Sequence, residues 1–68
     1  MLVEQIGETA GKIWTFLKEK GPSNFSQIER TVRSPKPVVH MAIGWLSREG
    51  KLHISQDKRS IVVTLNEN

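Results

Sequence analysis

The chain has 68 residues, enough for one small domain and too few for an enzyme with separate substrate and cofactor lobes. Hydrophobic residues make up 37% and charged residues 25% of the sequence, which is typical of a globular chain and excludes a disordered one. The longest apolar stretch, residues 38–46, is too short to cross a bilayer, so we expect no membrane partner. A net charge of +3 permits an anionic partner without requiring one.

The sequence contains no cysteine. This excludes disulfides and zinc–thiolate sites and fits a reducing compartment. Residues 1–4 form neither a signal sequence nor a basic transit peptide. We therefore expect a cytoplasmic protein.

The first predicted helix is amphipathic, because apolar residues between positions 2 and 17 recur at intervals of three and four. It should end at Gly21-Pro22, where glycine can take the left-handed conformation and proline cannot continue the helix. Gly7 and Gly11 lie one turn apart beside the apolar stripe, and each costs about 1 kcal/mol relative to alanine in a helix. We expect a close-packed neighbour there, either another helix of the chain or a second subunit.

A short second helix is indicated by Ser26 and Glu29, whose spacing is that of a capping box. Ile28 and Val32 would point inward from this helix. Phe25, just before the cap, would form a hydrophobic staple or a short strand.

A third helix is predicted from Ser34-Pro35, a serine cap followed by proline at the first helical position, to Glu49, with Gly50 ending it. At about 100° per residue, one side of this helix is apolar. We expect that side to be buried, and it consists of Val38, Ala42, Trp45 and Leu46. The opposite side consists of Lys36, His40, Ile43 and Ser47.

Beyond the third helix the apolar period changes to two, over residues 52–55 and again over residues 61–65. This period predicts two half-buried strands. The polar segment 56–60 between them would form the basic tip of a β-hairpin. We expect residues 1–65 to form a single α+β domain of three helices followed by a C-terminal hairpin, with residues 66–68 as a frayed tail.

This order of elements is that of a winged helix-turn-helix domain, in which the hairpin is the wing. Two segments, Ile-Gly-Glu-Thr-Ala-Gly-Lys-Ile-Trp at 6–14 and Ala-Ile-Gly-Trp-Leu-Ser-Arg-Glu-Gly-Lys at 42–51, resemble a family's signatures. That family consists of small stand-alone prokaryotic winged helix-turn-helix proteins of unknown function. The resemblance covers residues 3–65. It implies the fold and a homodimer, and it supplies no established activity.

The positive charge lies in the second half of the chain. Residues 1–32 are neutral, whereas residues 33–60 carry six basic and two acidic residues, a balance of +4. In winged helix proteins the third helix enters the major groove and the wing lies against the backbone or minor groove. By this resemblance the candidate contacts to double-stranded DNA are Arg33, Lys36, His40, Ser47, Lys51, Lys58 and Arg59.

The predicted groove-facing side lacks the arginine, asparagine or glutamine that would read bases through two hydrogen bonds. We therefore expect contacts to phosphates, in a transcriptional regulator or another DNA-associated factor. The alternative is a protein-interaction or dimerisation module that does not bind DNA. Its surface would consist of apolar residues, namely Leu2, Val3, Phe16, Val39 and Ile43. The broad apolar arc of the first helix also favours a homodimer.

Trp14 and Trp45 could offer a stacking platform for single-stranded nucleic acid. Both fall on or near the apolar side of their helices, so we expect them in the core. His40 and His53 are too far apart in sequence, and lack a third ligand, to suggest a metal site. The serines lack a paired histidine and acid. We predict no catalytic residue, metal, cofactor or small-molecule ligand.

Overall fold

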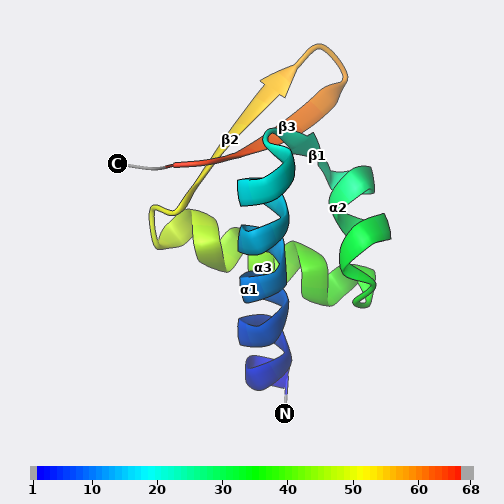
Figure 1. Ribbon diagram of the computed structural model, residues 1–68, viewed down its shortest axis with the longest axis vertical. Helices are drawn as coiled ribbons and strands as arrows, with labels where there is room; N and C mark the ends of the chain where they lie inside the picture. Colours follow the sequence, from blue (N-terminus) through cyan, green and yellow to red (C-terminus); the bar gives the residue numbers. More distant parts are fainter. Residues whose placement is uncertain (1, 67–68) are drawn as a thin grey trace.

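The computed structural model of the chain describes residues 2–66, and the side chains of Leu2 and Asp57 lie outside this description. The elements in chain order are α1 (Leu2–Lys20), β1 (Ser23–Asn24), α2 (Phe25–Val32), α3 (Lys36–Arg48), β2 (Leu52–Asp57) and β3 (Ser60–Leu65). Helix α1 crosses α3, and the β2–β3 hairpin projects away from the helices (Figure 1). The predicted α+β arrangement of three helices and a C-terminal wing is confirmed, with β1 as an additional strand.

Two glycines end helices as the sequence predicted. Gly21 has a φ of 83°, and its N–H donates to the carbonyl of Leu17 over 2.8 Å. Gly50, with a φ of 75°, donates to the carbonyl of Ser47 over 3.0 Å. Because a residue with a Cβ adopts this left-handed region at a cost, glycine is the favoured residue at both helix ends.

The predicted start of α2 at Ser26 is wrong. The N-cap is Asn24, whose side-chain oxygen accepts from the N–H of Gln27 over 2.9 Å. The Gln27 side chain accepts from the Asn24 N–H over 2.9 Å in return, which completes a capping box. Asn24 and Gln27 have the same spacing as Ser26 and Glu29, so the sequence offered two registers. The earlier one makes Phe25 the first helical residue.

The predicted serine cap of α3 is also wrong. Pro35 is the N-cap, without a side-chain hydrogen bond. The hydroxyl of Ser34 instead lies 3.1 Å from the hydroxyl of Thr9 on α1, which is buried. This polar contact ties the turn between α2 and α3 to the first helix.

The sheet is antiparallel, with the strand order β1-β3-β2. Leu52 pairs with Leu65 and Ile54 with Val63, so the apolar alternation predicted for the hairpin is confirmed. β1 adds to the other edge of β3, where Ser23 pairs with Val63. The short strand that was one alternative for Phe25 thus lies just before it, at Ser23–Asn24, because Phe25 itself begins α2.

Asn66 continues the contact at the base of the hairpin. Its N–H donates to the carbonyl of Lys51 over 2.9 Å, and its side-chain amide donates to the carbonyl of Gly50 over 3.1 Å. Of the three residues expected to form the tail, Asn66 is thus held to the turn, and residues 67–68 lie outside the described part of the chain.

The hydrophobic core lies between the three helices and the inner face of the hairpin. Its buried residues are Ala10, Ile13, Leu17, Ile28, Val32, Val39, Ala42, Ile43, Leu46, Leu52 and Val63. The rotation predicted for α3 is wrong, because Ile43 is 1% exposed and Trp45 is 55% exposed. Seven apolar residues between positions 38 and 46 cover most of the helix surface, so periodicity alone did not fix which side is buried.

The predicted apolar interaction surface is correspondingly changed. Val39 and Ile43 belong to the core, so they are not part of an exposed interaction surface. Phe16 is partly buried and packs against the core, whereas Val3 is 70% exposed. The side chain of Leu2 lies outside the described residues.

The prediction of buried tryptophans is wrong for both residues, since Trp14 is 38% exposed. The two helical glycines beside Trp14 have no close-packed neighbour within the described chain. A Cβ added to Gly7 or Gly11 would meet no atom within 4 Å among the residues considered. Of the two predicted neighbours, the helix of the same chain is therefore excluded.

Candidate nucleic-acid interface

The side of α3 that faces away from α1 is exposed. It includes the predicted contacts Lys36 and His40, together with Pro37, Met41, Gly44 and Arg48, whereas Ser47 is half-buried. Because Val39 and Ile43 anchor the opposite side in the core, this orientation is fixed by packing. The exposed side therefore presents cations near both ends of the helix and small or apolar residues between them.

His40 connects α3 to α2. Its Nε2 lies 2.5 Å from a carboxylate oxygen of Glu29, and its ring centroid lies 5.3 Å from that of Phe25. About half of the His40 side chain remains exposed. The imidazole is thus oriented by two residues of α2, and one of them brings a negative charge to this end of α3.

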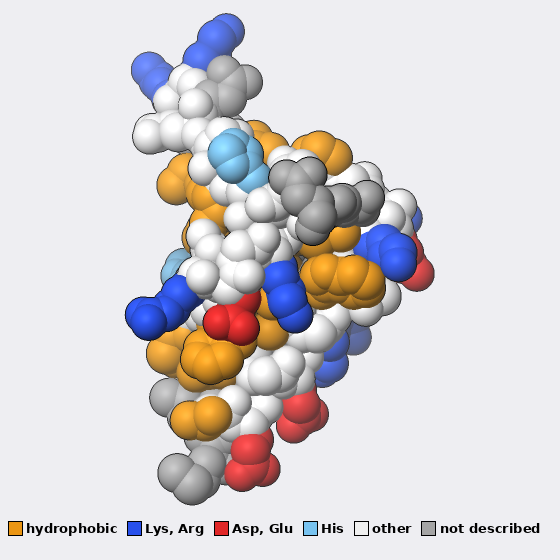
Figure 2. Space-filling model, turned by 90° about the vertical axis from the view of Figure 1, so that its left-hand side faces the viewer, with side chains coloured by type: hydrophobic (Ala, Val, Ile, Leu, Met, Phe, Trp, Pro, Cys, Tyr) orange, Lys and Arg blue, Asp and Glu red, His pale blue; other side chains and the backbone are white. Residues whose placement is uncertain are grey.

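The wing tip carries two adjacent cations, Lys58 and Arg59. They form the turn between β2 and β3, and both are exposed. Figure 2 shows the wing extending from the body with cationic side chains at its end. Lys58 has a φ of 55°, a left-handed conformation that costs a non-glycine residue roughly 1–2 kcal/mol.

Arg59 also lies near the beginning of α2. It lines a shallow depression of about 270 Å³ with Asn24, Phe25, Ser26, Ser60 and Ile61. The N-terminal end of a helix carries partial positive charge, which adds to that of the guanidinium. This part of the wing therefore combines two sources of positive potential.

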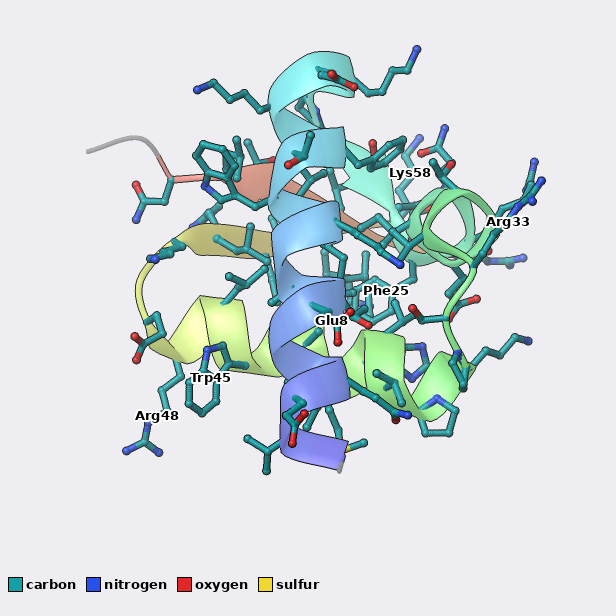
Figure 3. The ribbon with its side chains drawn as sticks, turned by 60° about the horizontal axis from the view of Figure 1, so that its bottom comes forward. Glu8, Phe25, Arg33, Trp45, Arg48 and Lys58 are labelled. Atoms are coloured by element: carbon teal, nitrogen blue, oxygen red, sulfur yellow. The ribbon has the colours of Figure 1, made fainter. Side chains whose placement is uncertain are left out.

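Arg33 lies in the turn between α2 and α3 and borders a depression beside α1. It is the C-cap of α2 with a φ of 60°, and its N–H donates to the Glu29 carbonyl over 3.3 Å. It lines a depression of about 190 Å³ that includes Glu8 and Lys12 of α1. Figure 3 shows its side chain extending outward beyond the start of α3.

Lys51 lies in a different environment from the other candidates. It lines a depression of about 290 Å³ between α1 and α3, together with Trp14 and Trp45. The predicted contacts therefore do not form one patch. Lys36, His40 and Ser47 lie on α3, and Lys58 and Arg59 at the wing tip, while Arg33 and Lys51 line depressions against α1.

Two exposed residues of α3 were missing from the predicted site. Arg48, the last residue of the helix, points away from the body in Figure 3. Met41 is 40% exposed. Centring the buried side of the helix on Val39 would have placed both of them outside. The prediction instead grouped Trp45 with Val38, Ala42 and Leu46 on the buried side of the helix.

No described helix is long and apolar enough to span a membrane. Within the described part of the chain, no group of three or more histidine, cysteine or acidic residues is arranged to hold a metal ion.

Three helices, a short β1 and a projecting C-terminal hairpin define a winged helix-turn-helix domain. The family model described as "Winged helix-turn-helix domain (DUF2582)" matches residues 1–65, and the chain belongs to this family. The chain is similar to the uncharacterized protein MJ1608 of Methanocaldococcus jannaschii, with 45% identity over 64 residues that make up 90% of each chain.

A solved structure shares the fold. The solution NMR structure of protein BT2368 from Bacteroides thetaiotaomicron matches 96% of this chain and 79% of that chain. The TM-score is 0.84 and the sequence identity 29%. The resemblance to a small winged helix-turn-helix family of unknown function is thus confirmed.

Proposed function

We propose that this domain binds double-stranded DNA through phosphate contacts made by the wing tip and the exposed side of α3. The observation that carries the proposal is the pair of exposed cations at the wing tip, Lys58 and Arg59. Lys58 occupies a left-handed turn position that glycine would fill without strain. A lysine at this strained position is understandable if its charge contacts a phosphate.

Phosphate binding suits the exposed side of α3 better than base reading does. Arg48 is its only arginine among the described residues, and it lies at the C-terminal end rather than the groove-entering N-terminal end. Gly44, in the middle, has no atom within 4 Å of its added Cβ position. The helix backbone can therefore approach a polyanion closely while the terminal cations contact phosphates.

We further propose that residues 1–65 act as one domain in the cytoplasm, as a homodimer without catalytic activity. Two copies would double the number of phosphate contacts, which compensates for the modest charge of each domain. The role in this proposal is that of a transcriptional regulator or another DNA-associated factor. The match of the family model to residues 1–65 supports the domain boundary.

A protein-interaction module is a second candidate, favoured by the two exposed indoles. Trp14 and Trp45 line one depression between α1 and α3, away from the wing tip. Although Lys51 also lines this depression, a surface with two indoles suits contact with another polypeptide, because tryptophan is enriched at protein interfaces. The two functions use different surfaces and can be tested separately.

The decisive experiment is a salt titration of binding to random duplex DNA. We expect binding at low salt with a steep dependence on salt concentration. Charge reversal of the wing, K58E/R59E, should weaken binding by about 10- to 100-fold and lower the salt slope by roughly 2, as expected for the loss of two phosphate contacts.

The matched control is K12E/K20E, which changes the net charge by the same amount on exposed positions of α1. It should affect binding much less than the wing variant does. Equal losses in the two variants would show that only net charge matters and would overturn the wing assignment. An absence of binding at low salt would leave the protein-interaction module.

A further inference from the structure

Helix α1 carries a stripe of small and apolar residues that remain wholly or partly exposed in the described chain. Val3, Gly7, Gly11 and Trp14 follow one another at intervals of four, four and three, which keeps them on one side of the helix. With Trp45 of α3 they form what we call the tryptophan face. Figure 2 shows several groups of hydrophobic side chains on this side of the body, below the wing, with charged side chains between them.

The two tryptophans border a depression in this face. Besides the indoles, its lining consists of Gly7, Ala10, Gly11, Leu46 and Lys51, and its volume is about 290 Å³. Trp45 extends outward from α3 in Figure 3. The face therefore has the form of a shallow groove along α1 with an indole on each side.

The glycines indicate what the groove accommodates. Each glycine costs about 1 kcal/mol in a helix interior, and neither Gly7 nor Gly11 is required by a positive φ or by a contact in the described chain. Replacing the Cβ by hydrogen lets another backbone approach closely. A helix packed along the stripe would use this space.

We propose that a second copy of this chain packs on the tryptophan face, with the two α1 helices antiparallel across a two-fold axis near Gly11. This names the interface of the homodimer proposed above and rests on that dimer, but not on DNA binding. In a two-fold interface, if residue i of one copy contacts residue j of the other, then residue j of the first copy also contacts residue i of the second. With the axis at Gly11, Trp14 of one copy would lie opposite position 8 of the other, beside Gly7.

The charges along α1 favour this occupant. The first turn contains Glu4 and the last turn Lys18 and Lys20. Antiparallel pairing about Gly11 brings Glu4 of one copy opposite Lys18 of the other, since both lie seven residues from the axis. The Lys18 ammonium already lies 4.8 Å from the Trp14 ring centroid, beside the groove.

This mixed pattern argues against a polyanion as the occupant. Glu4 lies beside one end of the stripe and Lys18 beside the other, so a nucleic acid would meet repulsion at the Glu4 end. A second copy meets opposite charge at both ends. The interface also leaves the wing tip and the outer side of α3 available for DNA.

The glycines provide a test in which stability and assembly change in opposite directions. A Cβ at position 11 meets no atom within 4 Å, and lysine is a better helix former than glycine, so Gly11→Lys should raise the melting temperature of the monomer slightly. It should also fill the space needed by the second α1. By sedimentation equilibrium at high micromolar concentration, we expect two chains for the wild type and one for G11K.

The matched control is Gly44→Lys, the same substitution at an exposed helical glycine with open space on α3. It lies outside the tryptophan face and should leave the mass of two chains unchanged. A wild-type mass of one chain, or a G11K variant that remains dimeric, would overturn the proposal. DNA binding by the wing is measured independently, so its failure would be recognised separately.

A charge exchange tests the antiparallel register. Glu4→Lys and Lys18→Glu each place like charges together at two symmetric positions, and each should raise the dimer dissociation constant by roughly 10-fold. The double variant restores opposite charges and should return to within about threefold of the wild type. If the double variant is as weak as the singles, the register is wrong. Quenching of tryptophan fluorescence by single-stranded nucleic acid in a monomeric wild type would likewise overturn the proposal.

Discussion

The tryptophan face and the wing tip are both exposed, yet they differ in the groups they present. The first consists of indoles, a valine and glycines on two helices held rigidly against the core through Ala10 and Leu46. The second consists of two long cationic side chains on a two-residue turn beyond the core. The tryptophan face offers shape and apolar area, and the wing tip offers positive charge on long, exposed side chains.

This difference bears on which partner each region can bind. Apolar surface contributes to binding only when a complementary surface excludes water from it, so the tryptophan face requires a shaped protein partner. Charge acts over about 8–10 Å at physiological salt and needs little complementarity, which suits a phosphate backbone of any sequence. A 68-residue domain can thus hold two binding surfaces without a second core.

The rotation of α3 separates the two regions, and Ile43 tests it most strongly. We expect Ile43→Ala to lower the free energy of unfolding by about 2–5 kcal/mol, because it removes a large side chain that is 1% exposed. Urea denaturation measures this loss. The same truncation at Trp45, which is 55% exposed, should cost the monomer much less. A small loss at Ile43 would mean that α3 is rotated and that the two surfaces merge.

The sequence predicted the elements of this fold better than their faces. The period of three to four in α1 and the period of two in the hairpin identify elements with one apolar side. In α3 the adjacent pair Val38-Val39 and the pair Ile43 and Trp45 permit several rotations. Only the contacts of α3 with α1, α2 and β2 select one. The exposure of Trp45, Met41 and Arg48 depends on that selection, and Trp45 was misplaced with it.

The N-cap of α2 affects the wing side of the comparison, because Arg59 lines a depression with residues of this cap. Asn24→Ala removes one partner of the capping box and should lower the free energy of unfolding by about 1 kcal/mol. Ser26→Ala is the control and should cost less than about 0.5 kcal/mol, since Ser26 is exposed and lies within α2. Thermal denaturation distinguishes the two variants, and the reverse order would favour the cap at Ser26.

The contact between Thr9 and Ser34 holds the α2–α3 turn, and with it Arg33, against α1. Thr9→Val keeps the shape of a side chain that is 3% exposed but removes the hydroxyl. We expect the free energy of unfolding to fall by about 0.5–1 kcal/mol, the net contribution of a hydrogen bond, as measured by urea denaturation. Thr15→Val, at an exposed position of the same helix, should change it very little. Equal effects would indicate that helix propensity, and not the contact, is responsible.

The smallest change in stability is expected for Lys58→Gly, and it is a gain, unlike the losses expected for Ile43→Ala, Asn24→Ala and Thr9→Val. Lys58→Gly relieves the strain of a φ of 55°, although glycine loses more backbone entropy on folding, so we expect a net gain of about 0.5 kcal/mol. The same change removes a proposed phosphate contact and should lower the salt slope of DNA binding by about 1.

Arg59→Gly is the matched control for that variant, because Arg59 is not among the described residues with a positive φ. It removes one cation from the same turn without relieving strain, so it should weaken DNA binding to a similar degree with no gain in stability. Denaturation curves and salt titrations of the two variants would separate backbone strain from charge. If K58G bound DNA as well as the wild type does, the charge at this strained position would serve another purpose than phosphate contact.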